Sequence, residues 1–222
     1  MQVEWYGQSA FRLTADSVTV FVDPFEDVSG LASRGLQFDY PPIVDVEAEL
    51  VLVTHEHQDH NGVSAIGGSP VVLRSTAGNL DSPVGKVLAV ASEHDQRAGT
   101  ERGPNTIFVF ELGGVRICHF GDFGQHRLRD EQAAAIGQVD LLLIPVGGGP
   151  TIGAEQAVAI SKRLRARWIV PMHYRTARIS FLDTAEEFLT RMPDVQRLDS
   201  PSFDTTELPA DRVPLAVVPA AP

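Results

Sequence analysis

The hydrophobic positions at the start of the chain fall into short segments rich in β-forming residues. These segments cover residues 2–6, 11–15 and 18–23, and they are separated by Gly7 and by the turn-forming pair Asp16-Ser17. The pattern predicts an antiparallel meander. Residues 24–49 contain several glycines and prolines and show no sustained period, which predicts a long excursion over the surface.

A continuous apolar run, Leu50-Val51-Leu52-Val53, predicts a strand that is buried on both faces. A short helix is expected near residues 62–66, and a hairpin turn at Gly113-Gly114. Similar patterns predict further strands at residues 70–74, 87–90, 106–111, 115–120, 141–145 and 168–170.

Helical spacing is found in the second half of the chain. Ala154, Ala157, Ile160 and Leu164 recur at steps of three, three and four, which predicts a helix with one apolar face. Thr184 and Glu187 are expected to form a capping box for a second helix. The proline-rich segment from about residue 193 is expected to be peripheral. Strands and helices that interleave after an opening meander favour an α/β sandwich of two mixed sheets.

Composition limits the class of protein. The 222 residues, 43% hydrophobic and 21% charged, suit one globular domain spanning residues 1–222. The net charge of −11 disfavours nucleic acid and anionic membranes as partners. The lone cysteine, Cys118, excludes an internal disulfide and is interpreted as a small buried side chain. Without a signal-peptide pattern or a bilayer-length apolar run, the expected location is cytoplasmic.

A cluster of metal-ligand residues directly follows the predicted strand at residues 50–53. The sequence His55-Glu56-His57-Gln58-Asp59-His60 has the pattern H-x-H-x-D-H. Side chains at positions i and i+2 point the same way in extended backbone, so His55 and His57 can share one metal ion while Asp59 and His60 reach a second. The alternative, a polar surface loop, would match this spacing only by chance.

Other candidate ligands follow predicted strands in the same way. They are His94, Asp122 and His173. Taken singly, each is more often a hydrogen-bonded loop residue than a ligand. Because α/β proteins assemble their sites beyond the carboxyl ends of strands, these residues and the histidine motif form one candidate set.

The ordered set of motifs resembles the metallo-β-lactamase-fold hydrolases. The segments 23–25, 102–106, 119–122, 145–148 and 171–174 resemble bacterial metal-dependent hydrolases related to the ascorbate-6-phosphate lactonases, and the likeness extends from Trp5 to about Thr176. The resemblance implies an αββα four-layer sandwich with two metal ions. His55, His57 and His94 would hold the first ion, Asp59, His60 and His173 the second, and Asp122 would bridge them. Nitrogen and oxygen ligands favour Zn²⁺, with Mn²⁺ or Fe²⁺ as alternatives.

Several residues near these motifs have competing interpretations. His119 competes with His94 as the third ligand of the first ion. The fixed direction of a strand side chain and the family order favour His94, which leaves His119 as a supporting or core residue. Asp23 is either a turn residue or a carboxylate that orients a ligand histidine. The segment 147–149 is interpreted as a tight turn rather than a phosphate cradle.

The chain departs from the family pattern in two places. Gln8 stands where the family usually has histidine, which would preserve a hydrogen bond but not a charge. Pro150 stands where an aromatic residue is expected, so the nearby wall of the pocket should differ.

The predicted chemistry is hydrolysis by a metal-bridging hydroxide, with Asp59 holding or moving the proton. Tyr174 could donate a hydrogen bond to the developing oxyanion. Arg102 and Arg175 could bind an anionic group of the substrate, although ordinary surface arginines are the alternative. The favoured substrate is a small anionic ester or lactone, and the alternative is a small nucleotide or phospholipid-like diester. The sequence is compatible with a homo-oligomer.

Other functions fit the residues less well. In the iron-dependent redox branch of the same fold, glutamate stands at the position of His57. A metal-binding module without catalysis is disfavoured, because no ligand position of the set is lost in this chain.

Overall fold

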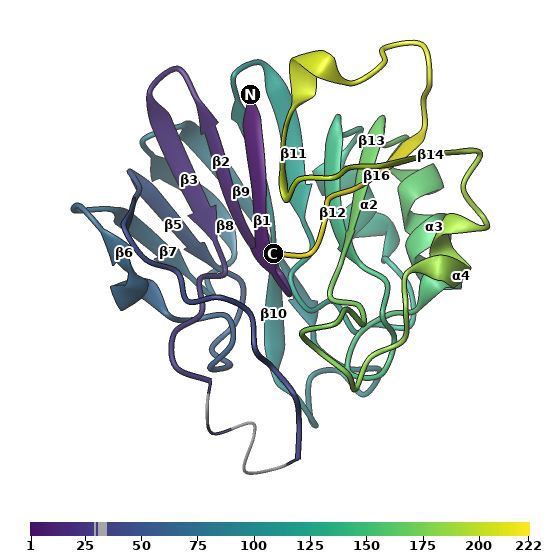
Figure 1. Cartoon of the computed structure of the whole chain (residues 1–222), viewed down its shortest axis with the longest axis horizontal. Coiled ribbons are helices and arrows are strands. Elements are labelled where there is room, and N and C mark those ends of the chain that lie inside the picture. The colour runs from purple at the N-terminus through teal and green to yellow at the C-terminus, as the bar shows by residue number, and fades with distance from the viewer. Residues whose placement is uncertain (29, 31–34) are drawn as a thin grey trace.

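The computed structural model describes residues 1–28, 30 and 35–222, and two large mixed sheets stand side by side in it (Figure 1). The six-stranded sheet has the order β15-β1-β2-β3-β5-β7 and the eight-stranded sheet the order β14-β16-β13-β12-β11-β10-β9-β8. The first sheet consists of β1 (Gln2–Gly7), β2 (Ala10–Ala15), β3 (Val18–Val22), β5 (Leu50–Val53), β7 (Val71–Arg74) and β15 (Ser202–Asp204). The second consists of β8 (Gly78–Ser82), β9 (Gly85–Glu93), β10 (Pro104–Leu112), β11 (Val115–His119), β12 (Leu141–Pro145), β13 (Trp168–Met172), β14 (Asp194–Arg197) and β16 (Leu215–Val218).

The predicted meander is confirmed, because β1, β2 and β3 pair antiparallel in sequence order. The apolar run that follows forms β5, which pairs parallel to β3 and β7 and is buried along its whole length. Leu50 and Leu52 face the space between the sheets, while Val51 and Val53 face the outer side. Since a strand's side chains alternate between its two faces, both faces must be covered, as the unbroken apolar sequence predicts.

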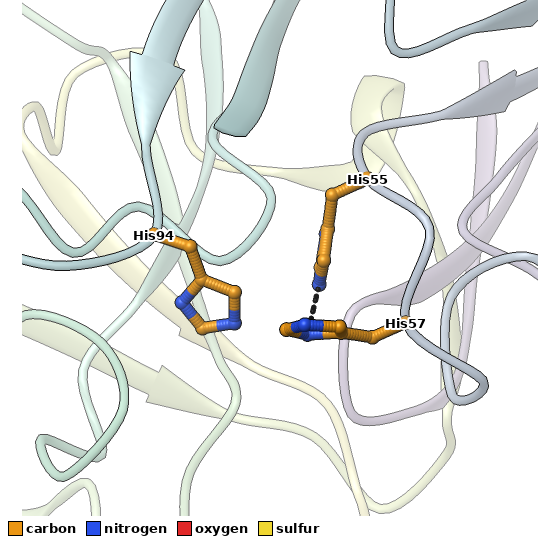
Figure 2. Close-up of side chains that lie close together, drawn as sticks. All are labelled: His55, His57 and His94. Atoms are coloured by element: carbon orange, nitrogen blue, oxygen red, sulfur yellow. Dashed lines mark hydrogen bonds between the residues drawn. The ribbon is translucent and has the colours of Figure 1, made fainter. Parts of the chain in front are cut away.

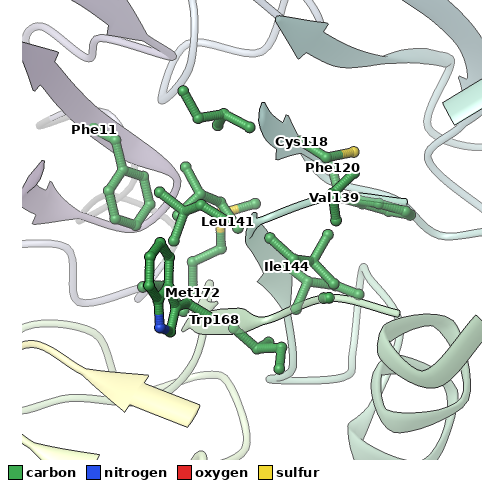
Figure 3. Close-up of a cluster of buried hydrophobic side chains, with 14 of the residues drawn as sticks. Phe11, Cys118, Phe120, Val139, Leu141, Ile144, Trp168 and Met172 are labelled. Atoms are coloured by element: carbon green, nitrogen blue, oxygen red, sulfur yellow. The ribbon is translucent and has the colours of Figure 1, made fainter. Parts of the chain in front are cut away.

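The main buried cluster is shared by the two sheets and extends to the helices beside the second one. Phe11 and Leu13 of the first sheet belong to the same buried cluster as Leu141, Ile144 and Met172 of the second. Figure 3 shows Phe11 on one side of this cluster, with Leu141, Ile144 and Met172 extending from strands of the other sheet. Burying this apolar surface is the largest favourable contribution to folding.

Helices cover the outer face of the eight-stranded sheet (Figure 1). They are α2 (Asp130–Ile136), α3 (Ala154–Arg163) and α4 (Glu186–Leu189). The helix predicted from the Ala154 spacing is α3, which buries Ala157 and Ile160. The expected cap of α4 at Thr184 is wrong, because the residue before its first turn is Ala185 and no side chain caps that end.

The outer face of the six-stranded sheet has a different cover. Phe25, Tyr40 and Ile43 from the long segment after β3 pack with Phe21 and Val51 of the sheet in a second buried cluster. The short helix predicted near residues 62–66 is a single 3₁₀ turn, Val63–Ala65, beside the small paired strands β4 (Val46–Glu47) and β6 (Ile66–Gly67). The surface excursion predicted for residues 24–49 therefore supplies core side chains where it is described.

The segment from about residue 193 is not peripheral. Strand β16 pairs with both β13 and β14 and is fully buried, and β15 pairs with β1 in the other sheet. The apolar run at Leu215–Val218 has only four residues. Because the segment around it is rich in proline, the sequence does not identify this run as a strand. Across the described residues, no helix has the length and apolar character needed to cross a bilayer.

Candidate metal centre

The candidate ligands converge at one end of the two sheets because they follow strands that end there. His94 comes directly after β9 and His173 directly after β13, while His55 is the second residue after β5. Asp122 lies in the loop after β11. His55, His94, Asp122 and His173 are all at most 3% exposed. Buried imidazole and carboxylate groups need partners.

Three histidines form one group of ligand atoms. His55, His57 and His94 each offer a ring nitrogen, and these nitrogens lie within 4.8 Å of one another. Figure 2 shows His55 and His57 from the same loop meeting His94 from the opposite side. His55 Nε2 lies 3.1 Å from His57 Nδ1. Two nitrogens at this distance need a shared proton or a cation between them.

A second group joins the first through Asp122. His60, Asp122 and His173 also have ligand atoms within 4.8 Å of one another. Asp122 Oδ2 lies 3.1 Å from His173 Nε2, 3.2 Å from His94 Nε2 and 3.3 Å from His60 Nε2. Asp59 Oδ2 lies 3.5 Å from His60 Nε2. One carboxylate oxygen therefore connects histidines of both groups.

For His94 and His60, the hydrogen bond at the far side of the ring determines which nitrogen faces the centre without a proton. His94 Nδ1 donates to the Pro150 carbonyl at 3.1 Å, and His60 Nδ1 donates to Asp23 Oδ2 at 3.0 Å. In a neutral imidazole the other nitrogen then carries a lone pair. These Nε2 lone pairs point at Asp122 Oδ2, and His60 Nε2 is buried without a hydrogen-bond partner in the described structure. Lone pairs directed at a carboxylate call for a cation, so this cluster could bind a metal ion.

The electrostatics agree with a cation site. Burial opposes ionisation of Asp122, yet His173 and His60 hold its pKa well below the ordinary value. Burial and the neighbouring histidines His60, His94 and His57 lower the pKa of His55. Burial also opposes a charge on His60, but the carboxylates Asp122, Asp59 and Asp23 raise its pKa. Either a proton or a metal ion, but not both, can occupy Nε2 of His60.

Asp23 forms hydrogen bonds to both ends of the loop that carries the histidine motif. Its carboxylate accepts hydrogen bonds from the Thr54 backbone N–H at 2.8 Å, from Thr54 Oγ1 at 2.7 Å and from His60 Nδ1. The Thr54 hydroxyl in turn accepts from His55 Nδ1 at 3.0 Å. Of the two interpretations given for Asp23, the structure places it where it orients a histidine.

Three residues around the centre have left-handed backbone. The φ angles are +52° at Gln8, +49° at Asp23 and +51° at His173. A side chain with a Cβ pays roughly 1–3 kcal/mol to stay in such a conformation, and such strain clusters at functional sites. Close backbone packing adds to this rigidity, because a Cβ on Gly147 would lie 2.2 Å from the His173 carbonyl oxygen. This contact agrees with a tight turn at residues 147–149.

The centre lies in a cavity of about 440 Å³. Gln8, Asp59, Arg102, Pro150 and Phe181 line it together with the metal-ligand candidates His57, His94, Asp122 and His173. Pro150 does form part of the wall. The guanidinium of Arg102 has no hydrogen bond or ion pair with the rest of the described chain, and it is exposed at the mouth.

The structure does not bring the other two predicted substrate contacts to this cavity. Tyr174 is 8% exposed, stacks on Trp5 at 5.4 Å between ring centroids and is not part of the lining. Arg175 turns its Nε to the Leu182 carbonyl at 2.5 Å. Their place beside His173 in sequence is misleading, because β13 ends before His173 and the left-handed backbone there breaks the regular alternation of a strand.

His119 lies in the core rather than in either ligand group. Its Nδ1 accepts the Gly121 backbone N–H at 3.0 Å, and its Nε2 donates to the Ser9 carbonyl at 2.9 Å. Both ring nitrogens are thus occupied, which agrees with a supporting role. Cys118 beside it is fully buried, as predicted.

We predict that His94→Ala lowers metal content by about one equivalent, whereas His119→Ala retains it and loses stability instead. Metal analysis after dialysis, combined with thermal unfolding, separates the two effects. Metal loss in the His119 variant together with full occupancy in the His94 variant would reverse the assignment.

Some supporting residues have no assigned role in the sequence-based prediction. Asn105 is buried and donates from Nδ2 to the Phe120 carbonyl at 2.9 Å, while its Oδ1 accepts the Asp122 backbone N–H at 3.0 Å. Ser9 Oγ donates to Asp122 Oδ1 at 3.2 Å. The sequence offered one signal for Asn105 and Ser9. Both are polar residues next to predicted strands, and both lie in segments that carry family-like motifs.

Comparisons with known proteins give a family match for most of the chain. Residues 2–173 match the family described as the beta-lactamase superfamily domain. A metal-dependent hydrolase of Thermus thermophilus is 32% identical over 201 residues, covering 79% of this chain and 84% of that protein. A metal-dependent hydrolase of Methanosphaera stadtmanae is 28% identical over 208 residues, covering 79% of this chain and 85% of that protein.

A solved structure is similar along nearly the whole chain. It is described as a Zn-dependent hydrolase of the metallo-beta-lactamase superfamily from Thermotoga maritima. It superposes with a TM-score of 0.77 and 30% identity, covering 98% of this chain and 97% of that one.

Proposed function

Because the chain belongs to the beta-lactamase superfamily and is a metal-dependent hydrolase of the metallo-beta-lactamase fold, we propose that it uses two metal ions to hydrolyse small anionic esters or lactones. The observation that supports two ions is Asp122 Oδ2, which lies within 3.3 Å of His60, His94 and His173. An oxygen between two groups of nitrogen ligands is suited to bridging two cations.

The residues present fit this pair of ions. His55, His57 and His94 would hold the first ion, Asp59, His60 and His173 the second, and Asp122 would contact both. The inward lone pairs of His60 and His94 are the direct support for this assignment. When bound, Zn²⁺ or a similar ion would supply Lewis acidity and hydroxide at neutral pH. The donor set of imidazole and carboxylate favours Zn²⁺ and admits Mn²⁺ or Fe²⁺.

The chain's own residues complete the reaction in this proposal. Asp59 is half-buried at the cavity wall, where its carboxylate can take up the proton that the nucleophile loses and return it to the leaving oxygen. Arg102 would bind an anionic group and orient the scissile bond. The stacked position of Tyr174 gives it no part in this scheme.

The proposal is tested by metal analysis and a substrate screen on the same preparation. The full chain purified without added metal is expected to contain close to two divalent ions, and to hydrolyse lactones or carboxylic esters faster than phosphodiesters. Activity should disappear on chelation and return on addition of Zn²⁺. Faster phosphodiester cleavage would favour the alternative substrate class, while full activity after complete demetallation would overturn the mechanism.

The role of Arg102 gives a charge-specific prediction. Arg102→Ala should raise the KM for an anionic ester by about tenfold or more and leave that of its neutral analogue within about twofold, because only the anion loses a partner. Arg175→Ala is the matched control, since its side chain is turned to Leu182. Equal changes in KM for charged and neutral esters would exclude an anion-binding role.

A further inference from the structure

Asp95 is a buried carboxylate that the proposed reaction does not use. It is 6% exposed, and its partners are backbone N–H groups. Its Oδ1 accepts hydrogen bonds from the Arg97 N–H at 2.7 Å and the Gly99 N–H at 2.9 Å. Its Oδ2 accepts hydrogen bonds from the Glu101 N–H at 3.0 Å and the Arg102 N–H at 2.8 Å. The loop of residues 96–102 therefore folds around one carboxylate.

This loop has few other contacts that could hold its shape. Residues 96–98 and 100–102 are exposed, and no residue from 95 to 104 belongs to either apolar cluster of the described chain. The ion pair between Arg97 and Glu101 is exposed at both ends, and such pairs contribute little to stability. The Gly103 N–H donates to the Gly99 carbonyl at 3.0 Å, which joins two parts of the same loop. The Asp95 carboxylate is thus the main group that fixes the backbone of residues 97–102.

Arg102 connects this loop with the metal centre. It is the one residue of the loop in the described lining of the 440 Å³ cavity, and its side chain is exposed. Its backbone N–H is held by Asp95 Oδ2, which limits the positions that the long side chain can reach. A group that is fixed before binding loses less conformational entropy when a ligand arrives. Anion binding by Arg102 should therefore depend on Asp95.

The metal-ligand candidate His94 has anchors that do not involve Asp95. Its Nδ1 donates to the Pro150 carbonyl at 3.1 Å. A Cβ on Gly124 would lie 2.4 Å from the carbonyl carbon of His94, so the two backbones pack closely. A change that loosens the loop after His94 should leave this ligand in place.

We propose that Asp95 is a positioning residue, whose carboxylate holds the backbone of residues 97–102 so that Arg102 meets an anionic substrate at the mouth of the metal centre. This inference rests on the proposed function, in which Arg102 binds the anionic group. Asp95 itself does not touch the substrate, and it acts only through Arg102.

The sign of the effect separates positioning from charge. Asp95 carries a negative charge in the same loop as Arg102, so by Coulomb's law alone its removal should strengthen the binding of an anion. Positioning predicts weaker binding. Asp95→Asn keeps the volume of the side chain, but in either orientation its NH₂ group faces two backbone N–H donors and repels them.

The test compares monomethyl succinate with methyl butyrate, which lacks the carboxylate, on the Zn²⁺-loaded full chain. Asp95→Asn should raise the KM for monomethyl succinate about fivefold. The KM for methyl butyrate, the kcat for both esters and the metal content should stay within about twofold of the wild-type values. The dissociation constant of succinate, measured by calorimetry without turnover, should rise by a similar factor. In an Arg102→Ala background, Asp95→Asn should change none of these values further.

Glu101→Gln is the matched control. It removes one negative charge from the same loop but keeps all four hydrogen bonds to Asp95, so both KM values should stay within about twofold of wild type. Asp95→Ser supplies the same readout if the asparagine variant does not fold. A serine hydroxyl can still accept from the N–H two residues later, at Arg97, but is too short to hold the Arg102 N–H as well.

Four results would overturn the inference: an equal rise in KM for both esters, an unchanged or lower KM for monomethyl succinate, loss of metal as the main effect, or the same effect with and without Arg102. If the wild-type protein hydrolyses neither ester, the proposed substrate class fails, and the binding of succinate still decides the role of Asp95. Succinate binding that depends on neither residue would overturn both this inference and the anion-binding role of Arg102.

Discussion

Replacing Asp122 with alanine is expected to abolish hydrolysis, with a fall in kcat/KM of at least about 1,000-fold. The reason is that Asp122 Oδ2 is the one described oxygen within 3.3 Å of His60, His94 and His173. Without it, both groups of ligands lose a shared negative charge, and metal content should fall with activity. Steady-state kinetics and elemental analysis of the same sample measure the two losses.

The fold should survive this change, because Asp122 lies in a loop outside the apolar clusters. Asp122→Asn keeps the volume of the side chain and should lose metal as well, which separates the charge from the shape. The exposed His126 gives the control, since His126→Ala should leave kcat/KM within about twofold of the wild-type value. Substantial activity in either Asp122 variant would remove this residue from the mechanism.

Replacing Asp23 with alanine is expected to lower both stability and metal affinity. The carboxylate is fully buried and accepts hydrogen bonds from the Thr54 backbone N–H, the Thr54 hydroxyl and His60 Nδ1. Its removal leaves buried donors unsatisfied, so the free energy of unfolding should fall by about 2–4 kcal/mol. His60 would lose its orientation, and metal affinity should fall by about 10- to 100-fold.

Chemical denaturation of the metal-free protein and titration against a competing chelator measure these effects separately. Asp23→Asn keeps one acceptor oxygen and tolerates left-handed backbone, so it should be less severe in both measurements. Thr54→Val removes the hydroxyl but leaves the contact between Asp23 and His60, so it should retain more metal than Asp23→Ala. Unchanged metal affinity in Asp23→Ala would show that His60 is oriented by something else.

The parts of the fold that follow from local pattern were predicted well. The meander, the doubly buried strand β5 and helix α3 each carry a period that fits one kind of element. Strand β8, helix α2 and the strands after residue 193 were missed. Strand β8 begins at a glycine and is mostly exposed, and α2 has only seven residues, so their stability comes from tertiary pairing and not from a local signal.

The candidate site shows the same division. The motif around His55 and the strand-end positions of His94, Asp122 and His173 follow from spacing and topology, and the structure brings these residues together. The direction of a side chain that only lies near a ligand in sequence does not follow in this way. Arg102 reaches the cavity while Arg175 does not, although each stands near a ligand in sequence. Contacts made by backbone carbonyls, such as that of Pro150 with His94, do not depend on residue type, so the sequence does not predict them.

The pairing of the late strands β15 and β16 has a consequence for the order of folding during synthesis. All seven proposed ligands lie at or before His173, yet β13, which ends directly before His173, has its outer edge covered only by β16. Likewise, β1 is joined on its outer side by β15, some 200 positions later in the chain. Until both strands have left the ribosome, two sheet edges stay open to pairing with other chains. A nascent chain that stops near residue 193 would thus contain every ligand and still be prone to aggregate.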